Sequence, residues 1–250
     1  MSVPCGSINR VEPSELITDL EHHGAAFARA CRAAGPDAPV PSCPGWTVDD
    51  LLWHLAEVHH FWGWVLTERV DTPEGYAPPD RPSGDALFDM YTAGLDRLAT
   101  ALRDTPADTA IWTWTDDHSA GWLVRRMAHE TAMHRWDADD AAGAAAPLDP
   151  ALASDGIDEF LSWFLSPAAD AQPVGGSVHI HCGDVAGEWT LRPDGDGFHV
   201  TSEHAKGDCA LRGAASDLLL VLWRRRPMST IDVVGDADVA ARFLAWPALT

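Results

Sequence analysis

The sequence predicts an α+β protein in which a helix bundle over residues 1–147 precedes a small α+β domain over residues 148–250. Three observations support this division. In the first 140 or so residues, apolar side chains recur three and four positions apart, as in amphipathic helices. After PVGG the sequence alternates between apolar and polar residues in short runs, as strands do. Between them, AAGAAAPLDP has the composition of a linker.

Four helices are predicted in the first domain, and two of them have clear end signals. The first ends before Gly35-Pro36, while Thr47 and Asp50 resemble the start of a capping box for the second. The proline-rich segment DTPEGYAPPDRP is too long for a simple bundle turn, so we expect a lid or a crossover there. The predicted helices span residues 13–34, 47–69, 84–104 and about 120–141.

The second domain is predicted to mix helices with strands. A helix from about 151 to 165 precedes four strands, read from SVHIHC, EWTLRP, GFHVTS and DCALRG. The sequence Asp194-Gly195-Asp196-Gly197 is typical of a tight turn between the second and third of these strands. A short helix in ASDLLLVLWRR, a strand in STIDVVG and a last helix in DADVAARFLAW complete the domain, which we therefore class as α+β.

The segment RRMAHETAMHRWDAD places Glu130 and His134 one helical turn apart. At helical spacing they share a face with Leu123, Met127 and Asp137. This face therefore begins with apolar residues and ends with residues that can bind a metal. A buried carboxylate and imidazole need a polar or charged partner. A divalent cation would satisfy both and would require a third ligand from elsewhere in the chain.

His54 is the candidate for that third ligand, because it too lies on an apolar helical face. Two helices with inward ligands describe a metal site inside a bundle. The residues alone leave alternatives open: His54 as a core histidine bonded to a backbone carbonyl, and Glu130 with His134 as an ordinary surface pair. The apolar neighbours of His54 on its face are Leu51, Leu55, Val58, Phe61, Trp62 and Val65.

Two segments, PSCPGWTVDDLLWHL and MAHETAMHRWDAD, resemble the mycothiol-dependent maleylpyruvate isomerase family, a branch of the DinB-like metal-binding four-helix bundles. The stretch DCALRGAASDLLLVLWRR is similar to the small C-terminal domain of that family. The resemblance implies a DinB-like bundle with zinc, or a similar divalent metal, on His54, Glu130 and His134. It also implies mycothiol as a thiol cosubstrate, but it does not specify the substrate, because reactions differ among members.

Three protein ligands would leave a fourth metal position for water or a thiolate. A metal-bound thiolate that adds to an electrophilic substrate can give isomerisation of the maleylpyruvate type or S-transfer, and the sequence does not separate these outcomes. Arg126, four residues before Glu130, is the candidate catalytic residue, because a guanidinium can bind a substrate carboxylate at two points. Its alternative is a surface arginine on the helix flank, and no thiol-binding residue can be assigned.

Two other functions fit the same ligands. In a zinc-dependent hydrolase the metal would hold water, and Asp137 would act either as general base or as a partner orienting His134. In a non-catalytic metal-binding stress protein, a fourth protein ligand would close the site, and His59 is the residue to check. Otherwise His59 and His60 are expected on the outer face of their helix, with the alternative that one of them lines the mouth of the pocket.

Composition limits the partners. With 38 acidic and 17 basic residues and a net charge of -21, the chain should repel nucleic acid and anionic membranes. We therefore expect a small electrophilic substrate and a low-molecular-weight thiol as partners. No targeting segment and no run of about 20 apolar residues is evident, so we expect a cytoplasmic protein.

Cysteine usage agrees with a reducing compartment. The five cysteines are widely spaced without a CxxC pair, which favours free thiols. We interpret Cys43 as a small buried packing residue and not as a nucleophile. We interpret His179 and His181, which alternate on a strand, as facing solvent and not as a second metal site, since no carboxylate or third histidine has a convincing spacing. Several tryptophans should line the core or a pocket: Trp46, Trp62, Trp112 and Trp122.

Overall fold

The computed structural model describes residues 11–249, which divide into two compact units. One unit is Glu12–Ala146, and the other contains the residues from Pro147 onward. The first consists of helices and the second of a small sheet with helices, so the predicted α+β class is confirmed. Within the described part of the chain, no helix is both long and apolar enough to span a membrane.

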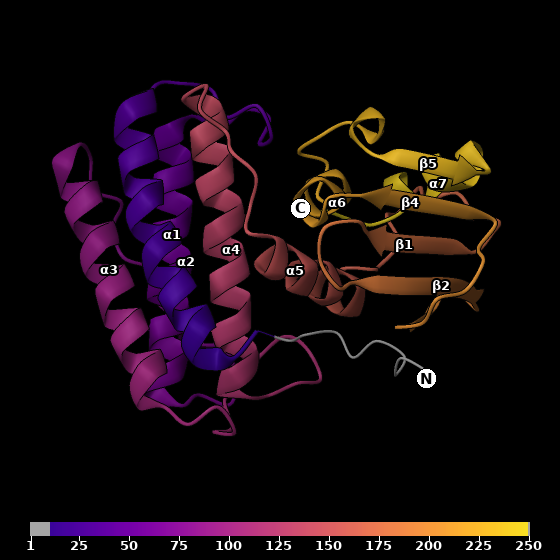
Figure 1. The fold of residues 1–250 in the computed structure, drawn as a ribbon. Coiled ribbons are helices and arrows are strands. Elements are labelled where there is room, and N and C mark those ends of the chain that lie inside the picture. The colour runs from indigo at the N-terminus through magenta and orange to yellow at the C-terminus, as the bar shows by residue number, and fades with distance from the viewer. Residues whose placement is uncertain (1–10, 250) are drawn as a thin grey trace. The chain divides into compact units, whose positions relative to one another are not determined.

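The first unit is a bundle of four long helices (Figure 1). The predicted capping box begins the second helix: the Thr47 side chain accepts from the Asp50 amide, and the Thr47 amide donates to the Asp50 carboxylate. Gly35, at a φ of 85° that disfavours side chains, ends the first helix. Residues 71–82 form no helix or strand, as predicted. The helices are α1 (Pro13–Ala34), α2 (Val48–Glu68), α3 (Asp85–Asp104) and α4 (Ala120–Ala141).

Packing in the bundle determines which helices can share a site. Helix α1 packs mainly on α4 and α3, whereas α2 packs on α3 and α4. At the α1–α3 contact, a Cβ on Gly24 would lie 2.4 Å from Leu95 Cδ2, so a larger residue there would displace the Leu95 side chain. Leu55 of α2 and Leu123 of α4 are fully buried. Since α2 and α4 are neighbours, ligands on their inner faces can meet.

The second unit contains one five-stranded sheet in the order β3-β2-β1-β4-β5. β1 and β4 are parallel, and the other neighbours are antiparallel. The strands are β1 (Val178–Cys182), β2 (Glu188–Asp194), β3 (Gly197–Thr201), β4 (Cys209–Gly213) and β5 (Asp232–Gly235). The helices are α5 (Pro150–Trp163), α6 (Ala215–Leu222), the 3₁₀ turn η1 (Met228–Thr230) and α7 (Ala237–Ala245).

Register in this sheet follows from the apolar alternation and from the predicted turn. Ile180 pairs with Trp189, and both are fully buried. Gly195, at a φ of 56°, makes the β2–β3 turn possible, because a side chain is disfavoured there. The same register places His181 opposite Glu188. The His181 imidazole is thereby placed beside the Glu188 carboxylate.

Candidate metal centre

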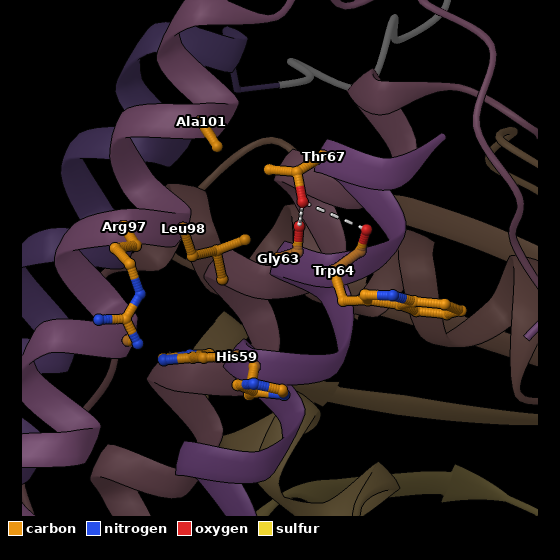
Figure 2. A pocket seen from close by; sticks show the side chains of 9 residues that line it. His59, Gly63, Trp64, Thr67, Arg97, Leu98 and Ala101 are labelled. Carbon is orange, nitrogen blue, oxygen red and sulfur yellow. Dashed lines mark hydrogen bonds between the residues drawn. The ribbon is translucent and has the colours of Figure 1, made fainter. Parts of the chain in front are cut away.

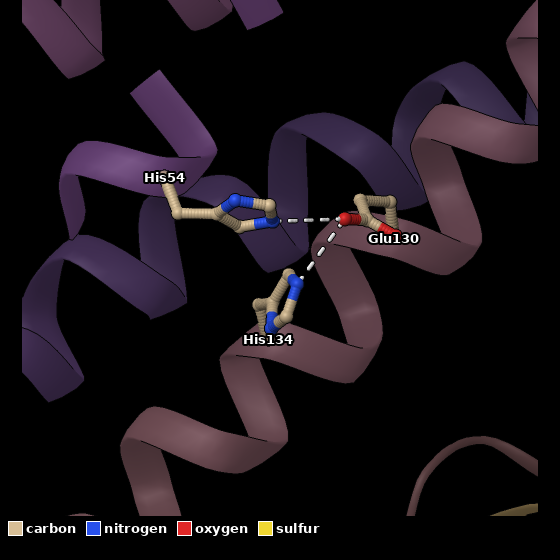
Figure 3. Close-up of side chains that lie close together, drawn as sticks. All are labelled: His54, Glu130 and His134. Atoms are coloured by element: carbon tan, nitrogen blue, oxygen red, sulfur yellow. Dashed lines mark hydrogen bonds and ion pairs between the residues drawn. The ribbon is translucent and has the colours of Figure 1, made fainter. Parts of the chain in front are cut away.

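His54 of α2 and Glu130 and His134 of α4 converge on one point inside the bundle (Figure 3). Glu130 Oε1 lies 3.3 Å from His54 Nε2 and 3.1 Å from His134 Nε2. The two imidazole rings meet edge to face with centroids 4.9 Å apart. One ligand atom from each residue lies within 4.8 Å of the others, so the structure brings together the three residues that the sequence singled out.

The second oxygen of Glu130 has a different partner. Arg126, one turn earlier on α4, donates from Nη2 to Glu130 Oε2 in a close ion pair. The arginine is buried, so it is not the exposed flank residue that we considered as its alternative. Glu130 thus presents one oxygen to the histidines while the guanidinium fixes the other. This arrangement orients the carboxylate toward the shared point.

Charge within the cluster shifts its pKa values in opposite directions. Burial by itself would raise the pKa of Glu130, but Arg126 and His134 outweigh it and hold that pKa well below its usual range. Burial would lower the pKa of His134, but Glu130 and Asp137 outweigh it and raise that pKa to about 9. With these side chains alone, His134 carries a proton at neutral pH. A divalent cation on the same atoms would replace that proton.

Asp137 lies behind His134. It is fully buried and accepts from His134 Nδ1 at 2.9 Å, on the side of the ring opposite Nε2. Ser42, in the segment before α2, donates to its other oxygen at 2.5 Å. No pattern in the sequence points to Ser42, because it lies far along the chain from Asp137. A carboxylate on the far nitrogen of a ligand histidine fixes its tautomer and orientation, so this geometry favours the orienting role of Asp137 over that of a base.

Replacing Asp137 with asparagine should weaken metal binding by about 10- to 100-fold while leaving all three ligands in place. The amide is the same size but lacks the charge that supports His134. Competition with a chelator, monitored for a bound divalent metal, measures this change. Asp139→Asn is the matched control, since Asp139 pairs with Arg135 on the same helix. Equal metal affinity in both variants would contradict the orienting role.

The tryptophans near the cluster are placed as predicted, whereas His59 is not. Trp46 lies against His54, with ring centroids 5.0 Å apart, and Trp62 is buried and stacked on Trp112. His59 is buried, so its predicted outer-face position is wrong. Its Nε2 lies 3.0 Å from Thr131 Oγ1, and burial lowers its pKa to about 3. His59 is not among the described residues that converge on the cluster.

A pocket of about 260 Å³ lies between α2 and α3 (Figure 2). His59 and Arg97 are among its lining residues, and the Thr67 hydroxyl on its α2 side donates to the Gly63 carbonyl. None of the three converging ligands lines it. This pocket is therefore distinct from the candidate metal centre.

The described cysteines, Cys31, Cys43, Cys182 and Cys209, form no disulfide, whereas Cys5 lies outside the described residues. Burial raises the pKa of the Cys31 and Cys182 thiols to about 12, which makes both poor nucleophiles. Cys43 is half-buried, so it is not the buried packing residue that we expected. Its sulfur lies 4.0 Å from the Ser42 hydroxyl.

The prediction that His179 and His181 face solvent is wrong for His179, which is buried, and incomplete for His181, which is partly exposed. The physical reason is the position of β1 inside the sheet, where side chains of neighbouring segments flank it. The two partners that sequence spacing did not reveal are Glu188 and His204. Strand pairing brings Glu188 beside these histidines, and the segment after β3 brings His204. Neither contact produces a recognisable spacing in the sequence.

The bundle, its inward cluster of two imidazoles and a carboxylate, and the appended sheet domain define a class of helix-bundle protein with a candidate metal centre. The sequence matches the family models "Mycothiol maleylpyruvate isomerase N-terminal domain" over residues 17–139 and "MDMPI C-terminal domain" over residues 151–242. The chain belongs to the mycothiol maleylpyruvate isomerase family. This confirms the family resemblance drawn from the motifs.

Solved structures show the same fold. A crystal structure of the mycothiol-dependent maleylpyruvate isomerase matches with a TM-score of 0.63 and 14% identity, covering 89% of this chain and 93% of the other. A mutant of that protein with a histidine replaced by alanine matches with a TM-score of 0.62, 13% identity and the same coverage. No curated protein sequence matches this chain significantly.

Proposed function

We propose that the protein is a zinc-dependent isomerase that uses mycothiol, or a thiol of that class, to isomerise an electrophilic substrate of the maleylpyruvate type. The observation that carries the proposal is the convergence of His54, Glu130 and His134 in a chain of this family. The family name supplies the thiol and the substrate class. The donor set supplies the reason to expect a metal.

The side chains fit a zinc ion of the catalytic type. Two imidazole nitrogens and one carboxylate oxygen are the donors of many catalytic zinc sites, in which a fourth position binds substrate or water. A zinc ion here would keep a thiol deprotonated near neutral pH, providing a nucleophile for reversible addition to an activated double bond. His54, Glu130 and His134 would hold the ion, and Asp137 would keep His134 in the tautomer with Nε2 available.

Arg126 supplies the positive charge that an acidic substrate would need. Its guanidinium is buried beside the cluster, where charge-assisted hydrogen bonds are strong. A guanidinium carries five N–H groups, and the ion pair with Glu130 Oε2 is made by Nη2. We propose that Arg126 also binds the substrate carboxylate. It would then align the substrate with the same cluster that it helps to orient.

The hydrolase alternative has less support than the thiol enzyme. It requires a general base within reach of a metal-bound water, and Asp137 was the candidate. That carboxylate is buried on the far nitrogen of His134 and already accepts from Ser42. A closed, non-catalytic site requires a fourth ligand, and the candidate His59 bonds Thr131. S-transfer would use the same residues as isomerisation, so only an experiment can distinguish the two reactions.

Purified protein, mycothiol and a cis-dienoic keto acid should together consume the substrate in a zinc-dependent reaction. Isomerisation regenerates the thiol, whereas S-transfer consumes one thiol for each substrate converted. Counting free thiol against product therefore decides between them, and we expect the thiol concentration to stay constant. Thiol loss equal to product would identify a transferase. Turnover of an ester or amide without thiol would favour a hydrolase.

A further inference from the structure

A second group of imidazoles surrounds a carboxylate in the sheet domain. His179 Nε2, His181 Nδ1 and His204 Nδ1 lie 2.8, 3.0 and 2.5 Å from the same atom, Glu188 Oε1. β1 provides two of the histidines, β2 provides the glutamate, and His204 follows β3. We propose that His179, His181, Glu188 and His204 bind one divalent cation of the zinc type through four protein ligands.

The sheet register explains why these groups meet. His179 and His181 are two residues apart on β1, so both project from the same face. His181 pairs directly with Glu188 across the antiparallel β1–β2 ladder, and His179 is its diagonal neighbour. The His204 ring lies edge to face on that of His179, with centroids 5.3 Å apart. Regular strand pairing, with the segment after β3, thus brings three histidines and one glutamate together on the sheet.

Hydrogen bonding alone accounts poorly for this arrangement. A carboxylate oxygen has two lone pairs, yet three imidazole nitrogens approach Glu188 Oε1. A zinc ion with bonds of about 2.0 to 2.2 Å to nitrogen and oxygen accepts four such ligands in a tetrahedron. One ligand atom from each of His179, His181 and Glu188 lies within 4.8 Å of the others, which is close enough for one ion to reach all three. His204 Nδ1, which already contacts Glu188 Oε1, would move toward the other two histidines as the fourth ligand.

Four protein ligands would leave no position for substrate. The site would instead tie β1, β2 and the segment after β3 together, as structural zinc sites do.

The test uses the full chain with the bundle cluster removed. His54→Ala/His134→Ala protein, stripped with a chelator and dialysed against zinc, should retain about one zinc per chain by elemental analysis. Adding His181→Ala and His204→Ala should weaken that binding by at least tenfold, and cobalt should lose the intense visible absorption of a tetrahedral site. His204 is largely exposed, so its replacement should not disturb folding. Circular dichroism checks this for each variant.

His199→Ala is the matched control, because His199 lies exposed on β3 and pairs with Arg192 outside the cluster. It should leave zinc binding unchanged. A folded His54→Ala/His134→Ala protein that binds no zinc would overturn the proposal, as would zinc retained undiminished after removal of His181 and His204. The experiment distinguishes the two proposed sites. If the His54→Ala/His134→Ala protein loses all its zinc, only the sheet site is refuted. If its zinc content equals that of the unmodified protein, only the bundle site is refuted.

Discussion

His134→Ala is expected to remove one equivalent of metal per chain and with it the thiol-dependent activity. His134 contributes one of three converging ligands, and its imidazole also links the Glu130 carboxylate to Asp137. His54→Ala and Glu130→Ala should have the same effect. The loss should exceed the roughly 10- to 100-fold weakening typical of residues that only position a ligand. Elemental analysis and chelator competition measure it.

His22→Ala provides the control for these variants, because His22 is an exposed histidine on α1 of the same bundle. It should keep both metal and activity. Circular dichroism should show that each ligand variant retains its helices, since the surrounding helix contacts are apolar. If metal content and activity survive in all three ligand variants, the cluster is an ordinary hydrogen-bonded group, and the proposed chemistry has no basis in this bundle.

Arg126→Ala should reduce the stabilisation of the transition state for an acidic substrate by about 2 to 4 kcal/mol. This corresponds to a fall in kcat/KM of roughly 30- to 700-fold. The reason is the loss of a buried charge-assisted contact to the substrate carboxylate. A neutral electrophile such as an epoxide lacks that carboxylate and should lose much less. Kinetics with both substrates, at matched zinc occupancy, make the comparison.

Zinc occupancy must accompany these kinetics, because Arg126 also pairs with Glu130. Equal losses for acidic and neutral substrates, together with a fall in metal affinity, would restrict Arg126 to orienting the ligand. Arg125→Ala is the matched control, since the neighbouring position on α4 faces a different direction. It should leave the preference for acidic substrates unchanged.

Local sequence was sufficient for the helices and for two of the three residues of the candidate centre. Glu130 and His134 share a face because four residues make one helical turn, and this spacing is a property of the backbone alone. Thr47 and Asp50 form the predicted capping box for an equally local reason. In the sheet domain, alternating apolar residues were enough to place Ile180 in the core.

Contacts between distant segments explain what the sequence did not reveal. Ser42 reaches Asp137 from the segment before α2, and no spacing rule connects them. Arg126 is close enough in sequence for its helical side to be predicted, but its pairing with Glu130 depends on burial of that side. His59 was misplaced because α2 is covered on more than one face by the packing of α3 and α4.

The sequence by itself determined the α+β class, the helix that carries Glu130 and His134, and the ligand character of its inner stripe. Only the tertiary structure decided that His54 approaches Glu130 from α2, and that His179 and His181 meet Glu188 and His204 instead of solvent. Periodicity fixes which residues share a face, because it follows from local backbone geometry. The partner of that face depends on helix packing and strand register, which join residues far apart in the chain.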